Sequence, residues 1–182
     1  MMPGVPDPWL FLMDRHPEVK VYLRADLGRR WGQTVWRDGV PEIHLAVDLG
    51  RIQRRCTLAH ELHHVMRGAP CRPLCPQDEA DVIDETARFL LPDLRVVATA
   101  LARWDLPAAA EQLQVTRNVL TERVDSLSDE EIAELAEMIE AATEPADGQA
   151  ALAVCVDSEK RSPRRATRVR KHSCRRVLRE SN

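Results

Sequence analysis

The segment CTLAHELHHVMRG, from Cys56 to Gly68, places three of the six histidines of the chain within five positions. Ile52, Cys56 and Ala59 recur at three- and four-residue steps ahead of them, and this period predicts a helix that begins near residue 50. Gly68 and Pro70 are typical of a helix end, so the helix should have about four turns. We therefore expect the chain to fold around a helix that carries a row of imidazoles.

His60 and His64 should project from one face of this helix because they lie one turn apart. Two imidazoles so placed can bind one metal ion, and Glu61 lies about 100° further round the helix, within reach of a metal-bound water. This is the H-E-x-x-H geometry of zinc peptidases, in which the glutamate acts as general base. A polar helix with solvated histidines is the alternative, but Cys56 and Ala59 on the same face favour a metal site. We predict Zn²⁺ at His60 and His64 and a catalytic role for Glu61.

A site with two histidines needs a third protein ligand. Residues 76–91 predict a second helix, and its apolar stripe through Ile83, Thr86 and Leu90 includes Glu79. Because this stripe should face the core and the first helix, Glu79 is the predicted third ligand. The weaker alternatives are Asp78, Asp81 and Glu85 on the same helix and the thiols of Cys71 and Cys75 in the preceding loop.

Two further residues, His63 and Tyr22, are considered for supporting roles. His63 follows His60 by three positions and duplicates the part that His64 plays, so we expect it to support the site or to lie on the surface. A peptidase also needs a hydrogen-bond donor that stabilises the developing oxyanion. Tyr22 is the only tyrosine and lies in a predicted strand at the edge of the sheet, which makes it a weak candidate for this donor.

The remaining patterns predict strands before the histidine helix and further helices after it. Residues 18–26 alternate apolar and polar side chains, as a half-buried strand does, and residues 30–49 predict a hairpin that turns at Asp38-Gly39. Residues 94–104 continue as helix, and three short helices are expected between 106 and 142. Thr116 and Ser128 are the predicted N-caps of two helices, and Glu131 completes a capping box with Ser128.

Two segments resemble the ImmA/IrrE-type metallo-endopeptidases. RRCTLAHELHH, residues 54–64, is similar to the T-L-A-H-E-x-x-H helix of that family, and EADVIDETARFLLP, residues 79–92, is similar to its second helix. The resemblance implies that zinc is bound by His60, His64 and Glu79 and that Glu61 is the catalytic acid/base. Ile83 departs from the family pattern, which usually has Asn or Asp at this position, and the loop between the two motifs is short.

The resemblance covers approximately residues 8–142, because AAAEQLQVTRNVLTERVDSL also resembles the helix-turn-helix-like lobe that follows the peptidase in such proteins. The expected fold class is α+β, with a small antiparallel sheet packed on a zincin-like helical core and then the helix-turn-helix-like lobe. We expect a peptidase domain over 1–104, the helical lobe over 105–143, and a basic, disordered tail over 144–182.

The resemblance also implies a narrow substrate range. Characterised relatives act on a single DNA-binding repressor, often encoded nearby in a phage or mobile element, and its cleavage releases transcription. The expected function is therefore a zinc-dependent endopeptidase that cleaves a helix-turn-helix repressor. The alternative is a DNA-binding or protein-binding regulator with a structural zinc and no proteolytic activity.

Charge is distributed unevenly along the chain. From Lys160 onward there are ten basic residues and one acid, Glu180, whereas the preceding residues include 16 basic and 28 acidic ones. A basic tail of this kind can contact DNA without sequence specificity. The five cysteines show no repeated spacing, the start of the chain lacks the features of a signal peptide, and no apolar run is long enough to span a bilayer. We expect a cytoplasmic protein with free thiols and no membrane contact.

Overall fold

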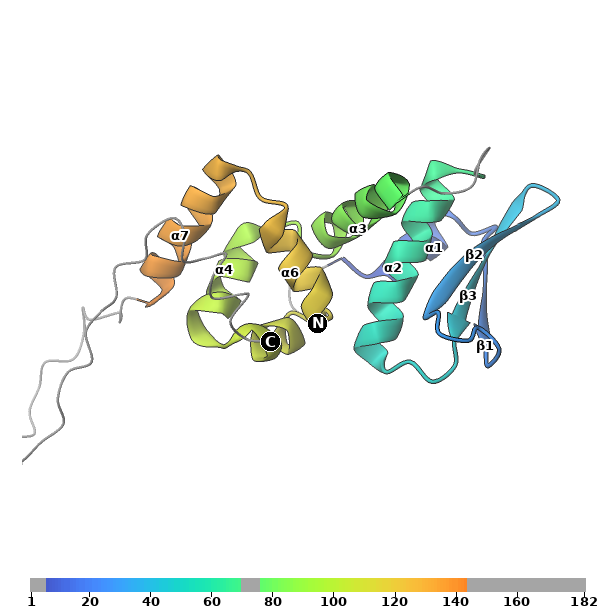
Figure 1. Ribbon diagram of the computed structural model, residues 1–182, viewed down its shortest axis with the longest axis horizontal. Coiled ribbons are helices and arrows are strands. Elements are labelled where there is room, and N and C mark those ends of the chain that lie inside the picture. Colours follow the sequence, from blue (N-terminus) through green and yellow to red (C-terminus); the bar gives the residue numbers. More distant parts are fainter. Residues whose placement is uncertain (1–5, 70–75, 144–182) are drawn as a thin grey trace, which may run out of the picture.

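The computed structural model describes residues 6–69 and 76–143, which form an α+β fold (Figure 1). Within these ranges there are seven helices and one three-stranded sheet. The elements in chain order are α1 (Pro8–Arg15), β1 (Lys20–Arg24), β2 (Gly32–Arg37), β3 (Val40–Ala46), α2 (Arg51–Arg67), α3 (Pro76–Leu90), α4 (Leu94–Arg103), α5 (Leu106–Gln112), α6 (Arg117–Asp125) and α7 (Asp129–Thr143).

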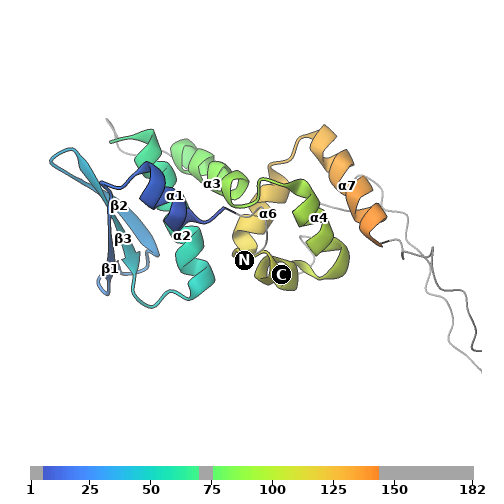
Figure 2. The ribbon, with the colours of Figure 1, turned by 180° about the vertical axis from the view of Figure 1, so that it is seen from behind.

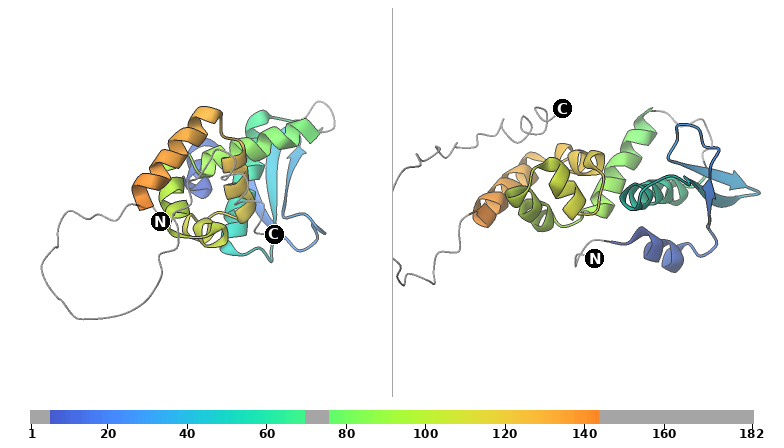
Figure 3. Two further views of the ribbon diagram at one scale, coloured as in Figure 1. Left: turned by 60° about the vertical axis from the view of Figure 1, so that its left-hand side comes forward. Right: turned by 90° about the horizontal axis from the view of Figure 1, so that it is seen from below.

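The molecule is elongated, with the sheet at one end and α7 at the other. Helices α2 and α3 lie between these ends, and α1 lies across α2 beside the sheet (Figure 2). Helices α4 to α7 gather at the end opposite the sheet (Figure 3). The predicted tail, 144–182, falls outside the described residues. Within the part of the chain that the structure describes, no helix is long and apolar enough to cross a membrane.

The hairpin prediction is confirmed. Strands β2 and β3 pair antiparallel, and Arg37 stands opposite Val40 across a two-residue turn. Asp38 and Gly39 both have positive φ, 51° and 80°, as a type I′ turn requires. The turn fixes the register that places Thr34 opposite Ile43, so the same face of the hairpin carries a polar edge residue and a fully buried core residue.

The prediction of an antiparallel sheet is wrong, because β1 runs parallel to β3. The strand order is β1-β3-β2, and residues 25–31 carry the chain from one edge of the sheet to the other. Val21 and Leu23 of β1 stand beside Ile43 and Leu45 of β3. The apolar alternation is correct for Val19, which is buried, and Val21, which is half-buried, but wrong for Leu23, which is 52% exposed. An alternation also holds no information on strand direction.

Helix α1 was not predicted, although the sequence contains its start signal. The side chain of Asp7 accepts a hydrogen bond from the backbone N–H of Trp9 at 2.8 Å, and Pro8 occupies the first helical position. This pair is a favourable helix N-terminus because Asp satisfies a free N–H and Pro has none to satisfy. The helix is short, and the side chain that it buries against α2 and the sheet is Leu12.

Helix α2 has the predicted extent and packs on two sides. Towards the sheet, Leu58, Leu62 and Val65 join Leu12, Val19, Ile43 and Leu45 in what we call the sheet-side cluster. Away from the sheet, Cys56 and Ala59 join side chains of α3 to α7 in the helix-side cluster, which includes Leu90, Val97, Leu113, Leu120 and Leu135. The helix is thus held by apolar contacts on both sides.

The later helices also begin where their capping residues predicted. The Thr116 hydroxyl accepts from the N–H of Val119 at the start of α6, and Ser128 and Glu131 form the reciprocal bonds of a capping box before α7. Helix α4 contacts both α5 and α7, so the helix-side cluster continues across residue 104, where the sequence predicted a domain boundary.

We predict that Leu62→Ala lowers the free energy of unfolding by about 2–5 kcal/mol, because it leaves a cavity in the sheet-side cluster. Leu62 is 1% exposed. Met66→Ala is the matched control, since Met66 lies one turn later in the same helix and is 44% exposed; it should cost less than about 1 kcal/mol. Urea denaturation followed by circular dichroism measures both, and equal losses would contradict the packing described for α2.

Candidate metal centre

Helices α2 and α3 bring His60, His64 and Glu79 together. Nε2 of His60 lies 3.1 Å from Oε1 of Glu79, and Nε2 of His64 lies 3.4 Å from Oε2 of the same carboxylate. The two Nε2 atoms are 3.2 Å apart, with the rings nearly perpendicular. Three potential ligand atoms therefore lie within 4.8 Å of one another, in a group that could hold a metal ion.

The two imidazoles are better shielded from solvent than the carboxylate. The side chains of His60 and His64 are 23% and 13% exposed, whereas that of Glu79 is 44% exposed. Burial lowers the pKa of both histidines, and the charge of Glu79 opposes this effect without overcoming it. The neutral imidazole is the form that binds metal ions, so burial favours the protonation state that a metal site requires.

The alternative carboxylates are used elsewhere or lie outside the group. Asp81 and Glu85 both face Arg67, at 3.7 and 2.8 Å. Asp78 lines the adjoining cleft but does not belong to the ligand group found among the described residues. Cys71 and Cys75 fall outside the described part of the chain.

The structure places Glu79 beside His60 and His64, but the apolar stripe from which it was predicted is wrong for Ile83. Ile83 is 39% exposed, and Val82 is fully buried in its place. The buried row of α3 therefore runs through Val82, Thr86 and Leu90, which are spaced four residues apart. Glu79 and Ile83 lie at the margin of this row, where side chains can enter a cleft as well as contact the core.

Glu61 lies beside the ligand group but does not join it. It is only 5% exposed, and its Oε2 atom accepts a hydrogen bond of 2.8 Å from the hydroxyl of Thr34 on β2. Burial raises the pKa of Glu61 to about 7; the Thr34 hydrogen bond opposes this rise, and the negative charge of Glu79 adds to it. A buried carboxyl group that titrates near neutrality can take up and release protons at physiological pH.

Gly32 makes room for the Glu61 side chain. A Cβ atom at position 32 would lie 2.5 Å from Cγ2 of Thr57 and 2.6 Å from Oε1 of Glu61, closer than side chains approach one another. Sequence reasoning missed both Gly32 and Thr34. A glycine inside a strand can mark a close approach by another element, but nothing in the local sequence names Glu61 as the group that approaches.

Two other residues named from the sequence lie away from the ligand group. His63 is buried; its Nδ1–H donates to the carbonyl of Ala59 at 2.8 Å, and its ring meets the edge of Phe89. Tyr22 lies on β1, with its ring against His44 and the guanidinium of Arg24 above it. Tyr22 is not among the residues that line the cleft at the ligand group, so it is poorly placed to stabilise an oxyanion there.

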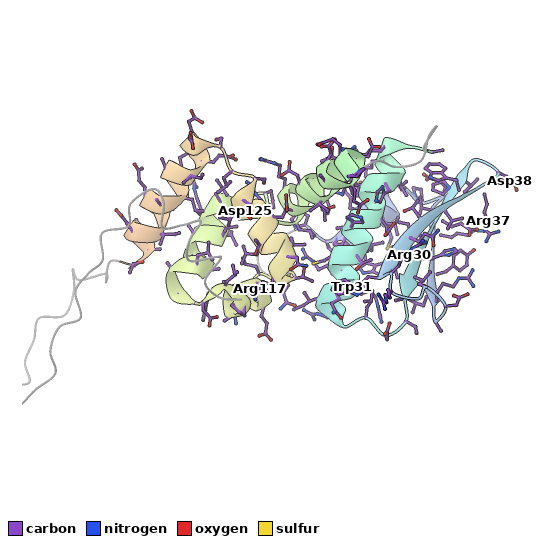
Figure 4. All side chains as sticks on the ribbon, viewed as in Figure 1. Arg30, Trp31, Arg37, Asp38, Arg117 and Asp125 are labelled. Atoms are coloured by element: carbon purple, nitrogen blue, oxygen red, sulfur yellow. The ribbon has the colours of Figure 1, made fainter. Side chains whose placement is uncertain are left out.

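The ligand group opens into a cleft of about 1300 Å³ whose walls come from four elements. One wall is β2 with the residues before it, the floor is α2, and the other walls are α3 and α6. Figure 4 shows Arg30 and Trp31 beside α2 at the start of the β2 wall, and Arg117 and Asp125 at the two ends of α6. Arg37 and Asp38 lie further away, at the tip of the hairpin.

Strand β2 presents a free edge to this cleft. The N–H of Ala46 donates to the carbonyl of Trp31, and the antiparallel alternation that follows directs the backbone groups of Gly32, Thr34 and Trp36 away from β3. No strand in the described ranges pairs with β2 on this side. All three residues line the cleft.

Comparison with known proteins adds no relative to this picture. A scan against protein-family models, a search of curated proteins and a search of solved structures each found no match.

We predict that Thr34→Val lowers the free energy of unfolding by about 1–3 kcal/mol, because the Glu61 carboxyl group then stays buried without its hydroxyl partner. Thr34→Ser is the control; it keeps the hydroxyl and should lose less than half as much. Urea denaturation of the metal-free proteins measures the difference. Equal stability of the Val and Ser variants would show that the hydrogen bond between Thr34 and Glu61 contributes nothing.

Proposed function

We propose that the protein is a zinc-dependent endopeptidase. In this proposal His60, His64 and Glu79 bind the zinc ion and Glu61 is the catalytic acid/base. The observation that carries the proposal is the convergence of three ligand atoms beside a buried carboxyl group at the wall of a cleft. A zincin-like arrangement of the sheet with α2 and α3, followed by a helix-turn-helix-like lobe, belongs to the same proposal.

The spacing of the ligand atoms supports zinc. Zinc takes imidazole nitrogen and carboxylate oxygen at about 2.0–2.1 Å in tetrahedral geometry, which places neighbouring ligand atoms about 3.3 Å apart. The two imidazole Nε2 atoms are 3.2 Å apart, and Nε2 of His60 and of His64 lie 3.1 and 3.4 Å from Oε1 and Oε2 of Glu79, respectively, so each imidazole is at this spacing from one oxygen of the carboxylate. Calcium and magnesium ions prefer oxygen atoms at every ligand position, so a site with two imidazole nitrogens disfavours the binding of either ion. Three protein ligands leave one tetrahedral position for a reactant, as catalytic zinc sites do.

The chemistry assigned to Glu61 is proton transfer. A zinc ion held by His60, His64 and Glu79 would lower the pKa of a water molecule and polarise the peptide carbonyl. Glu61 would accept a proton from the attacking water as the water oxygen adds to the carbonyl carbon, and it would deliver that proton to the amine nitrogen as the C–N bond breaks. Thr34 holds Oε2 of Glu61, and the space beside Gly32 accommodates Oε1.

The free edge of β2 offers a way to hold the substrate. An extended polypeptide can add to an exposed strand edge through main-chain hydrogen bonds, which do not depend on its sequence. Gly32, Thr34 and Trp36 would supply these bonds beside the ligand group. This mode of binding needs a substrate segment that is unfolded or can be drawn into an extended form.

The proposed substrate is a single DNA-binding repressor with a helix-turn-helix domain, by analogy with the peptidases that the two motifs resemble. A cleft that accepts an extended segment is compatible with a cut in a linker of such a repressor. The basic tail would then contact DNA close to the bound repressor without reading its sequence.

A regulator with a structural zinc is the second candidate function. Structural zinc sites normally have four protein ligands, whereas the group found within the described residues has three. Cys71 and Cys75 are candidates for a fourth ligand, and they lie between α2 and α3 in the chain. The two functions therefore make different predictions for these thiols.

We predict about one zinc ion per chain, and its loss in the double variant His60→Ala/His64→Ala, because two of the three ligands are removed. Removing a residue that only orients a metal ligand weakens metal binding roughly 10–100-fold. Glu79→Ala removes a proposed ligand itself and should therefore weaken zinc binding by more than this. Asp81→Ala is the matched control on the same helix and should bind zinc as the unaltered chain does. Elemental analysis and competition with a chelator measure both quantities.

The thiols separate the two candidate functions. The double variant Cys71→Ser/Cys75→Ser should keep its zinc if the site is catalytic, because neither sulfur is then a ligand. Loss of zinc from this variant would favour the structural site. Unchanged zinc content in the double histidine variant would contradict both functions.

We predict that Glu61→Gln keeps its zinc and its fold but loses at least about a hundredfold in turnover, because the amide cannot accept the proton. The candidate substrates for this assay are helix-turn-helix repressors encoded near the gene, and the products are identified by mass spectrometry. Glu134→Gln is the control, since Glu134 is an exposed residue of α7. Full cleavage by the Glu61 variant would limit Glu61 to a structural role.

A further inference from the structure

Helix α6 presents one face to the core and the other to the cleft. Leu120, Arg123 and Val124 are buried among the other helices. The opposite face contributes Asn118, Val119, Thr121 and Glu122 to the lining of the cleft that also contains the ligand group. In a helix-turn-helix protein the second helix of the pair enters DNA. Here the equivalent helix forms a wall of the proposed active site.

Both ends of α6 are fixed to the helices that carry the ligand group. At its start, the guanidinium of Arg55 on α2 donates to the carbonyl of Gln114 at 2.7 Å. At its end, Arg88 on α3 donates to the carbonyl of Ser126, also at 2.7 Å. The position of this wall relative to His60 and Glu79 is therefore set by hydrogen bonds as well as by apolar packing.

Glu122 carries a charge that no described residue neutralises. No ion pair or side-chain hydrogen bond reaches its carboxylate from the residues in 6–69 and 76–143. Burial raises the pKa of Glu122, and the negative charges of Asp84 and Asp125 raise it further. Asp84 is already paired with Arg88 at 3.1 Å, so a cation brought to this position would gain mainly from the carboxylates of Glu122 and Asp125.

An apolar surface adjoins this charge. Val119 lies three residues before Glu122, on the same cleft-lining face of α6. Ile83 of α3 lines the same cleft and is 39% exposed. Exposure of an isoleucine side chain to water costs free energy, and an apolar group that covers the side chain in the cleft offsets this cost. The wall thus combines an acidic position with an apolar one.

We propose that α6 selects the substrate, with Glu122 receiving a lysine or arginine side chain of the bound polypeptide while Val119 and Ile83 contact an apolar side chain next to it. The inference rests on the proposed function, because it concerns the same cleft. It assigns the lobe to protein recognition and not to DNA, since the exposed face of α6 meets the substrate and its acidic residues repel a phosphate backbone.

The test uses the zinc-loaded full chain with Glu61→Gln, which can bind peptides without cutting them, on an array of immobilised peptides of randomised sequence. Peptides with Lys or Arg at one position should be enriched about fivefold, as expected for a partly exposed ion pair. Adding Glu122→Lys should abolish or reverse this preference. Adding Glu134→Lys, the same charge change on α7, should leave it intact.

Glu122→Gln provides a second variant that preserves side-chain shape, and it should reduce the preference without reversing it. Zinc content and circular dichroism verify that each variant is folded. A Lys/Arg preference that survives both Glu122 variants, or the absence of any preference, would overturn the inference.

Cleavage of the same peptides in solution by the chain with Glu61 intact separates the two proposals. If the peptides are cleaved but their binding shows no Lys/Arg preference that depends on Glu122, only the proposed role of α6 is contradicted. If binding shows this preference but no peptide is cleaved, only the peptidase proposal is contradicted. A chain that neither binds nor cleaves any peptide contradicts both.

Discussion

The packing of α2 between two apolar clusters determines where every group of the candidate site lies. Leu58 and Leu62 fix the helix against the sheet, and Cys56 and Ala59 fix it against the other helices. His60, Glu61 and His64 lie on the side of α2 that lines the cleft, and Glu61 is the most deeply buried of the three. The site is a consequence of a helix that is buried on two flanks.

The position of Glu61 has an electrostatic cost that a cation would offset. Burial and the nearby charge of Glu79 both disfavour the ionised form of Glu61, and the single hydroxyl of Thr34 compensates only in part. A divalent ion among His60, His64 and Glu79 would neutralise Glu79 and add a positive charge near Glu61. Metal binding and stability of the folded state should therefore be coupled at this site.

Local patterns in the sequence predicted residues that the periodicity of a single helix marks, and they failed for the contact that depends on how the sheet lies against α2. The i, i+4 spacing located His60 and His64, and the stripe on α3 located Glu79 even though it misplaced Ile83. The contact of Thr34 with Glu61 spans 27 positions in the chain. It depends on which edge of the sheet faces α2, and apolar alternation does not determine that edge because it leaves strand direction undefined.

The predicted lobe, which contains α5 to α7, shares one apolar cluster with α4 and with the ligand-bearing helices. Ala59 of α2 and Leu90 of α3 are fully buried in the helix-side cluster together with Leu113 and Leu120 of the lobe. Removing the lobe would expose this surface of α2 and would release α6 from the cleft. The helices α5 to α7 can therefore be required for the stability of α2 and for the shape of the cleft. Neither requirement involves contact with DNA.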